Sequence, residues 1–127
     1  MDKIANSKHC ILVVDDDEDV LFLMKKTLQL EGYDTTVSPN GENIMDIIAQ
    51  STPDMILLDI HMNGIDGGTI CKLIKTNKTT ANIPILMFSA NENIAGITRQ
   101  CGADGYIRKP FEPTQLKQKI KQILYHS

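Results

Sequence analysis

Three short apolar runs, each followed by a polar residue, constrain the fold of this chain more than any other feature. They are residues 10–14 before Asp15, residues 55–58 before Asp59, and residues 85–88 before Ser89. Unbroken runs of this length are typical of strands that are covered on both faces, because a half-exposed strand would alternate apolar and polar residues. The chain is therefore expected to place three buried strands in a sheet, each ending in a polar side chain.

Between these runs, apolar residues recur at helical spacing. The first helical segment ends before Gly32, the second ends before Pro53, and the third begins at Pro113. Their apolar stripes are Val20, Leu23, Met24 and Leu28; Ile44, Ile47 and Ile48; and Leu116, Ile120, Ile123 and Leu124. Weaker strands fit residues 35–37 and 104–107. Strand and helix thus alternate about five times, which predicts an α/β fold with a parallel sheet and helices on both faces.

The composition is that of one soluble globular domain. The 127 residues are 42% hydrophobic and 23% charged, enough for a single core but not for an additional output or catalytic domain. Residues 9–127 are expected to form this domain, and residues 1–8 an N-terminal extension. The net charge of −3 argues against non-specific binding to nucleic acid, which needs a basic surface.

The cysteines and the lack of long apolar segments indicate a cytoplasmic protein. Cys10, Cys71 and Cys101 are odd in number and have no C-x-x-C spacing, so they suggest neither a disulfide framework nor a zinc site. No apolar run approaches the roughly 18 residues that a membrane span requires. We therefore expect no membrane association.

Four polar residues follow predicted strands, and their chemistry is complementary. Ligands of open α/β sheets bind beyond the carboxyl ends of the strands, so Asp15, Asp59, Ser89 and Lys109 should converge. Clustered carboxylates repel one another and need a cation, and their hard oxygens suit Mg²⁺, with Mn²⁺ as a substitute. With an ammonium and a hydroxyl beside it, such a site fits a phosphoryl group that Asp59 would attack. Read alone, however, Ser89 could equally cap the next helix and Lys109 could be a surface charge.

Four separated motifs, in this order, make the chain resemble a known family: ILVVDDDEDV, PDMILLDIHMNGIDG, PILMFSA and GADGYIRKPF. The chain is similar to response-regulator receiver domains, the phospho-acceptors of two-component signalling, and in particular to single-domain chemotaxis regulators. The similarity extends from about residue 10 to residue 125. It implies a flavodoxin-like, doubly wound fold whose five-stranded parallel sheet has the strand order 2-1-3-4-5.

The resemblance also implies a role for each acidic residue of the site. Asp59 would be the phosphorylated residue, and Asp15 and Asp16 the acidic pair that binds Mg²⁺ together with Asp59 and the backbone carbonyl of His61. The remaining acids of the run, residues 17–19, would then form the negatively charged first turn of a helix.

Further roles follow from the motifs near the C-terminus. Ser89 and Lys109 would each contact a phosphoryl oxygen, and the bond between Lys109 and Pro110 would be a cis peptide that orients the lysine. Tyr106 matches the aromatic residue that turns inward as the hydroxyl of Ser89 moves toward the phosphoryl group. An aromatic residue in a terminal strand is, however, more often a simple packing residue.

The function implied by this resemblance is signalling rather than turnover of an external substrate. A sensor histidine kinase or a histidine phosphotransfer protein would supply the phosphoryl group. A downstream protein would bind the face formed by the fourth helix, fifth strand and fifth helix, about residues 91–100 and 106–124. We expect no direct contact with nucleic acid. Homodimerisation through the same face is common in the family, and the sequence leaves it open.

Two other interpretations use the same residues. A haloacid-dehalogenase-type phosphatase also has an aspartate nucleophile, Mg²⁺, a hydroxyl and a lysine, and residues 15–17 form its D-x-D motif. That family, however, has Thr or Val where Asp19 stands, and a late acidic pair that this sequence lacks. A calcium-binding loop starting at Asp15 would need Gly and Glu where Val20 and Lys26 stand. Both alternatives therefore explain fewer residues than a receiver domain does.

Overall fold

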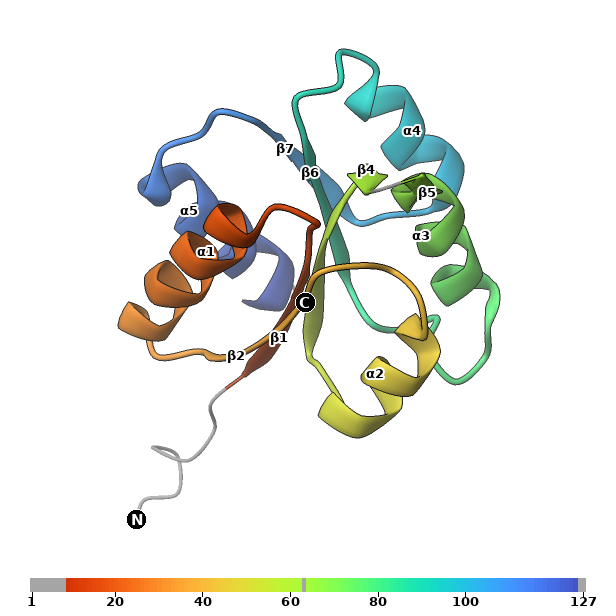
Figure 1. The fold of residues 1–127 in the computed structure, drawn as a ribbon, viewed down its shortest axis with the longest axis horizontal. Coiled ribbons are helices and arrows are strands. Elements are labelled where there is room, and N and C mark those ends of the chain that lie inside the picture. Colours follow the sequence, from red (N-terminus) through yellow and green to blue (C-terminus); the bar gives the residue numbers. More distant parts are fainter. Residues whose placement is uncertain (1–8, 63, 126–127) are drawn as a thin grey trace.

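The fold is a parallel sheet between two layers of helices (Figure 1). The computed structural model describes residues 9–62 and 64–125, so the predicted extension at residues 1–8 lies outside the described residues. The elements, in chain order, are β1 (Cys10–Val14), α1 (Glu18–Leu30), β2 (Asp34–Ser38), α2 (Ile44–Ser51), β3 (Met55–Asp59), β4 (His61–Met62), β5 (Ile65–Asp66), α3 (Gly67–Thr76), β6 (Ile85–Ser89), α4 (Ile94–Cys101), β7 (Gly105–Arg108) and α5 (Pro113–Tyr125). Among these helices, none has the length and apolar character needed to cross a membrane.

The order of strands in the sheet is β2-β1-β3-β6-β7, and every neighbouring pair is parallel. The predicted order 2-1-3-4-5 is confirmed, since β6 and β7 are the fourth and fifth strands of this sheet. The short strands β4 and β5 form a separate antiparallel hairpin in which His61 pairs with Asp66. This hairpin was not predicted, because two-residue strands leave no periodic pattern in the sequence.

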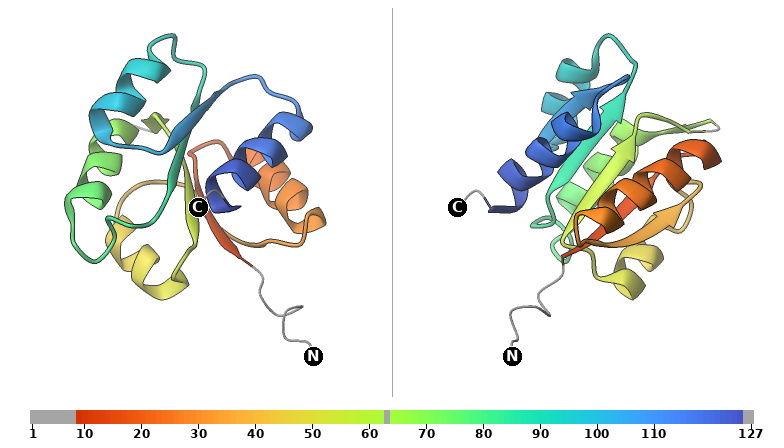
Figure 2. Two further views of the ribbon diagram at one scale, coloured as in Figure 1. Left: turned by 180° about the vertical axis from the view of Figure 1, so that it is seen from behind. Right: turned by 90° about the vertical axis from the view of Figure 1, so that its left-hand side faces the viewer.

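Helices cover both faces of the sheet, with α1 and α5 on one face and α2, α3 and α4 on the other (Figures 1 and 2). Strand β1 shows why its apolar run does not alternate with polar residues. Leu12 and Val14 pack in the core on the side of α2, α3 and α4, whereas Ile11 and Val13 pack on the side of α1 and α5. All four are fully buried, so both faces of the strand are apolar.

Helix α1 begins at the acidic run. The side chain of Asp17 accepts hydrogen bonds from the backbone N–H groups of Asp19 and Val20, which caps the helix, and Glu18 and Asp19 occupy its first turn. The prediction that Leu23 belongs to the buried stripe was wrong, because its side chain is 65% exposed. The helix instead buries Leu21, Met24 and Leu28, which are three and four residues apart. Leu23 lies beside that stripe.

The sheet edge at the amino ends of β6 and β7 is fixed by an ion pair. Lys75 Nζ lies 2.8 Å from Asp104 Oδ2 and donates hydrogen bonds to the carbonyl oxygens of Ile83 at 2.8 Å and Ala81 at 3.3 Å. Asp104 also accepts a hydrogen bond from the backbone N–H of Ile85 at 2.8 Å. These contacts link α3, the start of β6 and the segment between α4 and β7.

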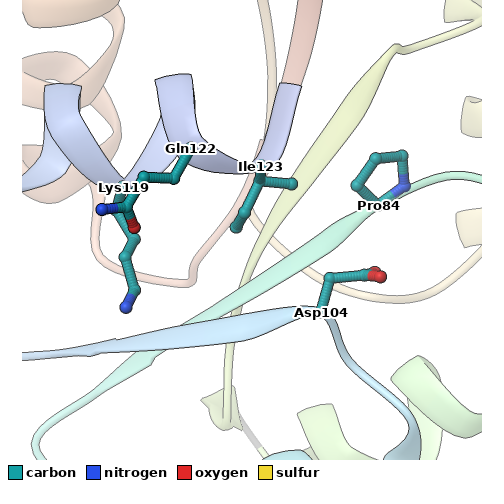
Figure 3. Close-up of a pocket in the computed structure, with 5 residues that line it drawn as sticks. All are labelled: Pro84, Asp104, Lys119, Gln122 and Ile123. Atoms are coloured by element: carbon teal, nitrogen blue, oxygen red, sulfur yellow. The ribbon is translucent and has the colours of Figure 1, made fainter. Parts of the chain in front are cut away.

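A surface hollow of about 610 Å³ lies at this same edge (Figure 3). Its lining consists of Pro84, Asp104, Lys119, Gln122 and Ile123. Pro84 and Asp104 precede strands, whereas Asp15, Asp59 and Ser89 follow or end them. The hollow is therefore at the opposite edge of the sheet from the predicted site.

Candidate functional site

Neighbouring strands end at the same level, and this brings the predicted site residues together. Val14 is in register with Leu58, Asp59 with Phe88, and Ser89 with Arg108. Asp15, Asp59, Ser89 and Lys109 therefore all lie at the carboxyl edge of the sheet, where open α/β sheets bind ligands.

Lys109 joins the two buried carboxylates of this edge. Its Nζ atom lies 3.0 Å from Asp15 Oδ2 and 3.7 Å from Asp59 Oδ2. The ammonium also lies 4.8 Å from the centre of the Phe88 ring, a cation–π contact that holds it over β6. Asp15 is only 1% exposed, so this pairing compensates for charge that water cannot reach.

Asp16 completes a cluster of three carboxylates with Asp15 and Asp59. One oxygen of each lies within 4.8 Å of the others. Asp15 and Asp59 are buried and Asp16 is partly exposed, so the cluster opens toward solvent on one side. Hard carboxylate oxygens at this spacing are the donor set that Mg²⁺ and Mn²⁺ bind, and the residues present therefore fit a divalent cation.

Burial changes the acidity of Asp59. Desolvation is the main cause that raises its pKa from 3.8 to about 6, and the charge of Asp15 adds to the rise. The charge of Lys109 and hydrogen bonds from the backbone N–H groups of Ile60 and His61 act in the opposite direction. The Ile60 bond is 2.8 Å long. A negative charge at Asp59 is thus costly unless a further cation is present.

The hydroxyl of Ser89 is buried at the end of β6, next to this cluster in the sheet order. Its Oγ atom accepts a hydrogen bond from the backbone N–H of Asn91 at 3.1 Å, the local turn bond that a serine makes at such a position.

Tyr106 is half-buried and packs against the core on the α2, α3 and α4 side. The peptide bond between Lys109 and Pro110 is cis.

A side-chain contact between β4 and the loop that follows β6 was not predicted from the sequence. His61 has an exposed side chain, and its Nε2 atom lies 2.8 Å from Asn91 Nδ2. From the other side, Arg108 Nη1 donates to the carbonyl oxygens of Asn91 at 3.4 Å and Glu92 at 3.3 Å. Isolated exposed polar residues have no regular spacing that would predict such contacts.

Gly67 was also not predicted as a residue of the site, although a glycine in the first turn of a helix can indicate a close backbone contact. This buried glycine donates its N–H to the Ile60 carbonyl at 2.6 Å. A Cβ atom here would collide with the backbone oxygen of Asp59 and lie 2.8 Å from Ile60 Cα. The first turn of α3 therefore lies directly against the backbone of Asp59, at a distance that only glycine permits.

Comparison with known proteins agrees with this geometry. Residues 11–121 match the response regulator receiver domain family. Over 121 residues the chain is 35% identical to the alkaline phosphatase synthesis transcriptional regulatory protein PhoP of Bacillus subtilis, which covers 92% of this chain and 49% of that protein. It is 34% identical over 118 residues to the response regulator MprA of Mycolicibacterium vanbaalenii, covering 90% of this chain and 49% of that protein.

Solved structures give the same result. The receiver domain of NtrX from Brucella abortus superposes with a TM-score of 0.82 at 31% identity, covering 92% of this chain and 99% of that one. Chemotaxis protein CheY4 of Vibrio cholerae, at 24% identity, shares the fold with a TM-score of 0.85 over 93% of this chain and all of that one. The chain spans about half the length of the curated relatives it matches. This chain belongs to the response regulator receiver domain family of two-component systems.

Proposed function

We propose that this receiver domain accepts a phosphoryl group on Asp59 from the phosphohistidine of a sensor histidine kinase or a histidine phosphotransfer protein. The observation that carries the proposal is the cluster of Asp15, Asp16 and Asp59, with Lys109 paired to two of its members. Membership in the receiver family also disfavours a haloacid-dehalogenase-type phosphatase. The chain would be a cytoplasmic signalling module and not an enzyme with an external substrate.

Mg²⁺ is the proposed cofactor, and Mn²⁺ could substitute for it. Asp15, Asp16 and Asp59, with the backbone carbonyl of His61, would hold the ion. When bound, it would neutralise carboxylate charge and draw electron density from a phosphoryl oxygen. The raised pKa of Asp59 supports this assignment, because a nearby cation would favour the ionised nucleophile.

In the transfer step, an ionised oxygen of Asp59 attacks phosphorus in line with the phosphorus–nitrogen bond of the donor. That bond breaks, its electron pair returns to the imidazole nitrogen, and an aspartyl phosphate forms. Lys109 would pair with one phosphoryl oxygen in place of its contact with Asp15. Ser89 would donate its hydroxyl hydrogen to another.

The proposed switch follows from these new contacts. Movement of Ser89 would leave space for Tyr106 to turn inward and alter the face formed by α4, β7 and α5. A downstream protein would bind this face, about residues 91–100 and 106–124, and homodimerisation could use the same surface. No direct contact with nucleic acid or membrane is part of the proposal.

The test is acid-labile labelling by acetyl phosphate in the presence of Mg²⁺, read by mass spectrometry. The wild-type chain should gain one phosphoryl group, and Asp59→Asn should gain none. Asp46→Asn is the matched control, since it removes an exposed carboxylate on α2 and should be labelled like the wild type. Absence of labelling in the wild type, or equal labelling of Asp59→Asn, would refute the proposal.

A further inference from the structure

Asn91 lies at the centre of a hydrogen-bond network in residues 90–93, the β6–α4 loop. Its backbone N–H donates to Ser89 Oγ at 3.1 Å, and its side-chain oxygen accepts the N–H of Asn93 at 2.7 Å. Its side-chain nitrogen contacts His61 Nε2 at 2.8 Å, and its carbonyl oxygen accepts from Arg108 at 3.4 Å. All four polar groups of this one residue are therefore engaged.

Arg108 holds the same loop from β7. Its Nη1 atom donates to two successive carbonyls, those of Asn91 and Glu92. Ser89 and Arg108 are in register across the β6–β7 pair, and the N–H of Lys109 donates to the Ser89 carbonyl at 2.9 Å. The loop is thus fixed on the hairpin side by His61 and on the β7 side by Arg108.

These contacts bear on the movement of Ser89, which the proposed function requires. The Ser89 hydroxyl oxygen accepts a hydrogen bond from the Asn91 N–H. Movement of the hydroxyl therefore requires either that the loop moves with it or that this bond breaks. Arg108, Glu92 and His61 are exposed, and water competes for each of their hydrogen bonds. Bonds of this strength bias an equilibrium between two loop conformations without preventing exchange.

We propose that Arg108 is a positioning residue that, together with the His61–Asn91 contact, holds the β6–α4 loop in its unphosphorylated conformation. Losing the Arg108 contacts should favour the conformation in which Ser89 faces the phosphoryl group. The inference rests on the proposed function. On this inference, Arg108 on β7 lowers the rate at which Asp59 is phosphorylated. It acts through the loop and does not contact the reacting atoms.

The experiment compares Arg108→Gln and Arg108→Lys with the wild type, in acetyl phosphate and saturating Mg²⁺. Arg108→Gln should raise the initial rate of labelling about fivefold, the effect expected from losing about one net hydrogen bond. Arg108→Lys keeps a charged donor, so its rate should stay close to that of the wild type. Lys78→Gln removes the same charge at an exposed position on the α3–β6 connection and should leave the rate unchanged.

A conformational readout separates positioning from a general loss of stability. Without phosphate donor, the amide NMR signals of the loop in Arg108→Gln should shift toward their positions in the phosphorylated wild type. The thermal midpoint of unfolding should stay close to that of the wild type.

Three results would overturn the proposal: a rate for Arg108→Gln within twofold of the wild type, a lower rate, or an equal effect of Arg108→Lys. If the wild type itself is not labelled, the proposed function fails. If the wild type is labelled normally and Arg108→Gln matches it, only the positioning role fails.

Discussion

Replacing Asp59 by Asn should stabilise the protein at neutral pH in the absence of divalent cations. The pKa of Asp59 is raised from 3.8 to about 6 by burial and by Asp15. Asparagine has nearly the same shape and carries no charge, so the variant avoids the cost of an ionised carboxylate in this position. The increase in the free energy of unfolding follows from the pKa.

Each tenfold change in proton affinity is worth about 1.4 kcal/mol, so the raised pKa corresponds to about 2 to 3 kcal/mol at pH 8. The folded state binds the Asp59 proton more tightly than the unfolded state does. The stability that this proton provides is fully present below about pH 4 and is lost as the pH rises through about 6. The advantage of the Asn variant should therefore grow from pH 4 to pH 7 and then level off.

Urea unfolding followed by circular dichroism, from pH 4 to pH 8 in a chelator, measures this difference. For a chain of this length, 2 to 3 kcal/mol corresponds to roughly 7 to 11 °C in the thermal midpoint. Asp46→Asn is the control for loss of a carboxylate and should show no such pH-dependent gain. Added Mg²⁺ should stabilise the wild type more than Asp59→Asn. Equal stability of the two proteins at pH 8, or an advantage that grows on acidification, would contradict the reasoning.

Five further substitutions test the site and its support. Asp15→Asn should weaken Mg²⁺ binding at least tenfold by calorimetry, and an unchanged affinity would remove this residue from the metal site. Lys109→Ala should raise the pKa of Asp59 further, because Lys109 lowers it, and an NMR titration of the Asp59 carboxyl carbon that shows a lower value would contradict this. Gly67→Ala should cost about 2 kcal/mol or more in urea unfolding, since its Cβ would collide with the Asp59 backbone. Leu28→Ala should cost about 2 to 5 kcal/mol, whereas Leu30→Ala, at a side chain that is 85% exposed, should change stability by less than about 0.5 kcal/mol.

The residues that the sequence located best are those fixed by the sheet. Asp15, Asp59 and Ser89 each follow or end an apolar run, and parallel strands in register must bring such positions to one edge. Lys109 was located by its place after the last strand and by its KPF context. A short local pattern was therefore enough to place these residues at one edge, because parallel strands in register end at the same side of the sheet. Their roles depended on the four motifs together.

The contacts from β4 and β7 to the β6–α4 loop could not be predicted in the same way. The His61–Asn91 bond and the bonds from Arg108 join residues that are 30, 17 and 16 positions apart, through exposed side chains with no periodicity. The exposure of Leu23 was missed for another reason. A helical stripe is broad, and one residue at its border can face either the core or solvent.

The two ends of α4 are anchored very differently. At its C-terminal end, buried Cys101 accepts a hydrogen bond from Cys71 on its carbonyl, and the Lys75–Asp104 ion pair follows three residues later. At its N-terminal end, Ile94 is buried in the core, but the preceding loop is held by exposed bonds to Arg108. If this loop moved while the contacts near Cys101 held, α4 would tilt about a pivot near Cys101. With a rise of 1.5 Å per residue, a tilt of about 10° would move the first turn by about 2 Å and the last turn hardly at all. A spectroscopic probe near Asn93 should therefore report the motion that a probe beside Cys101 would miss.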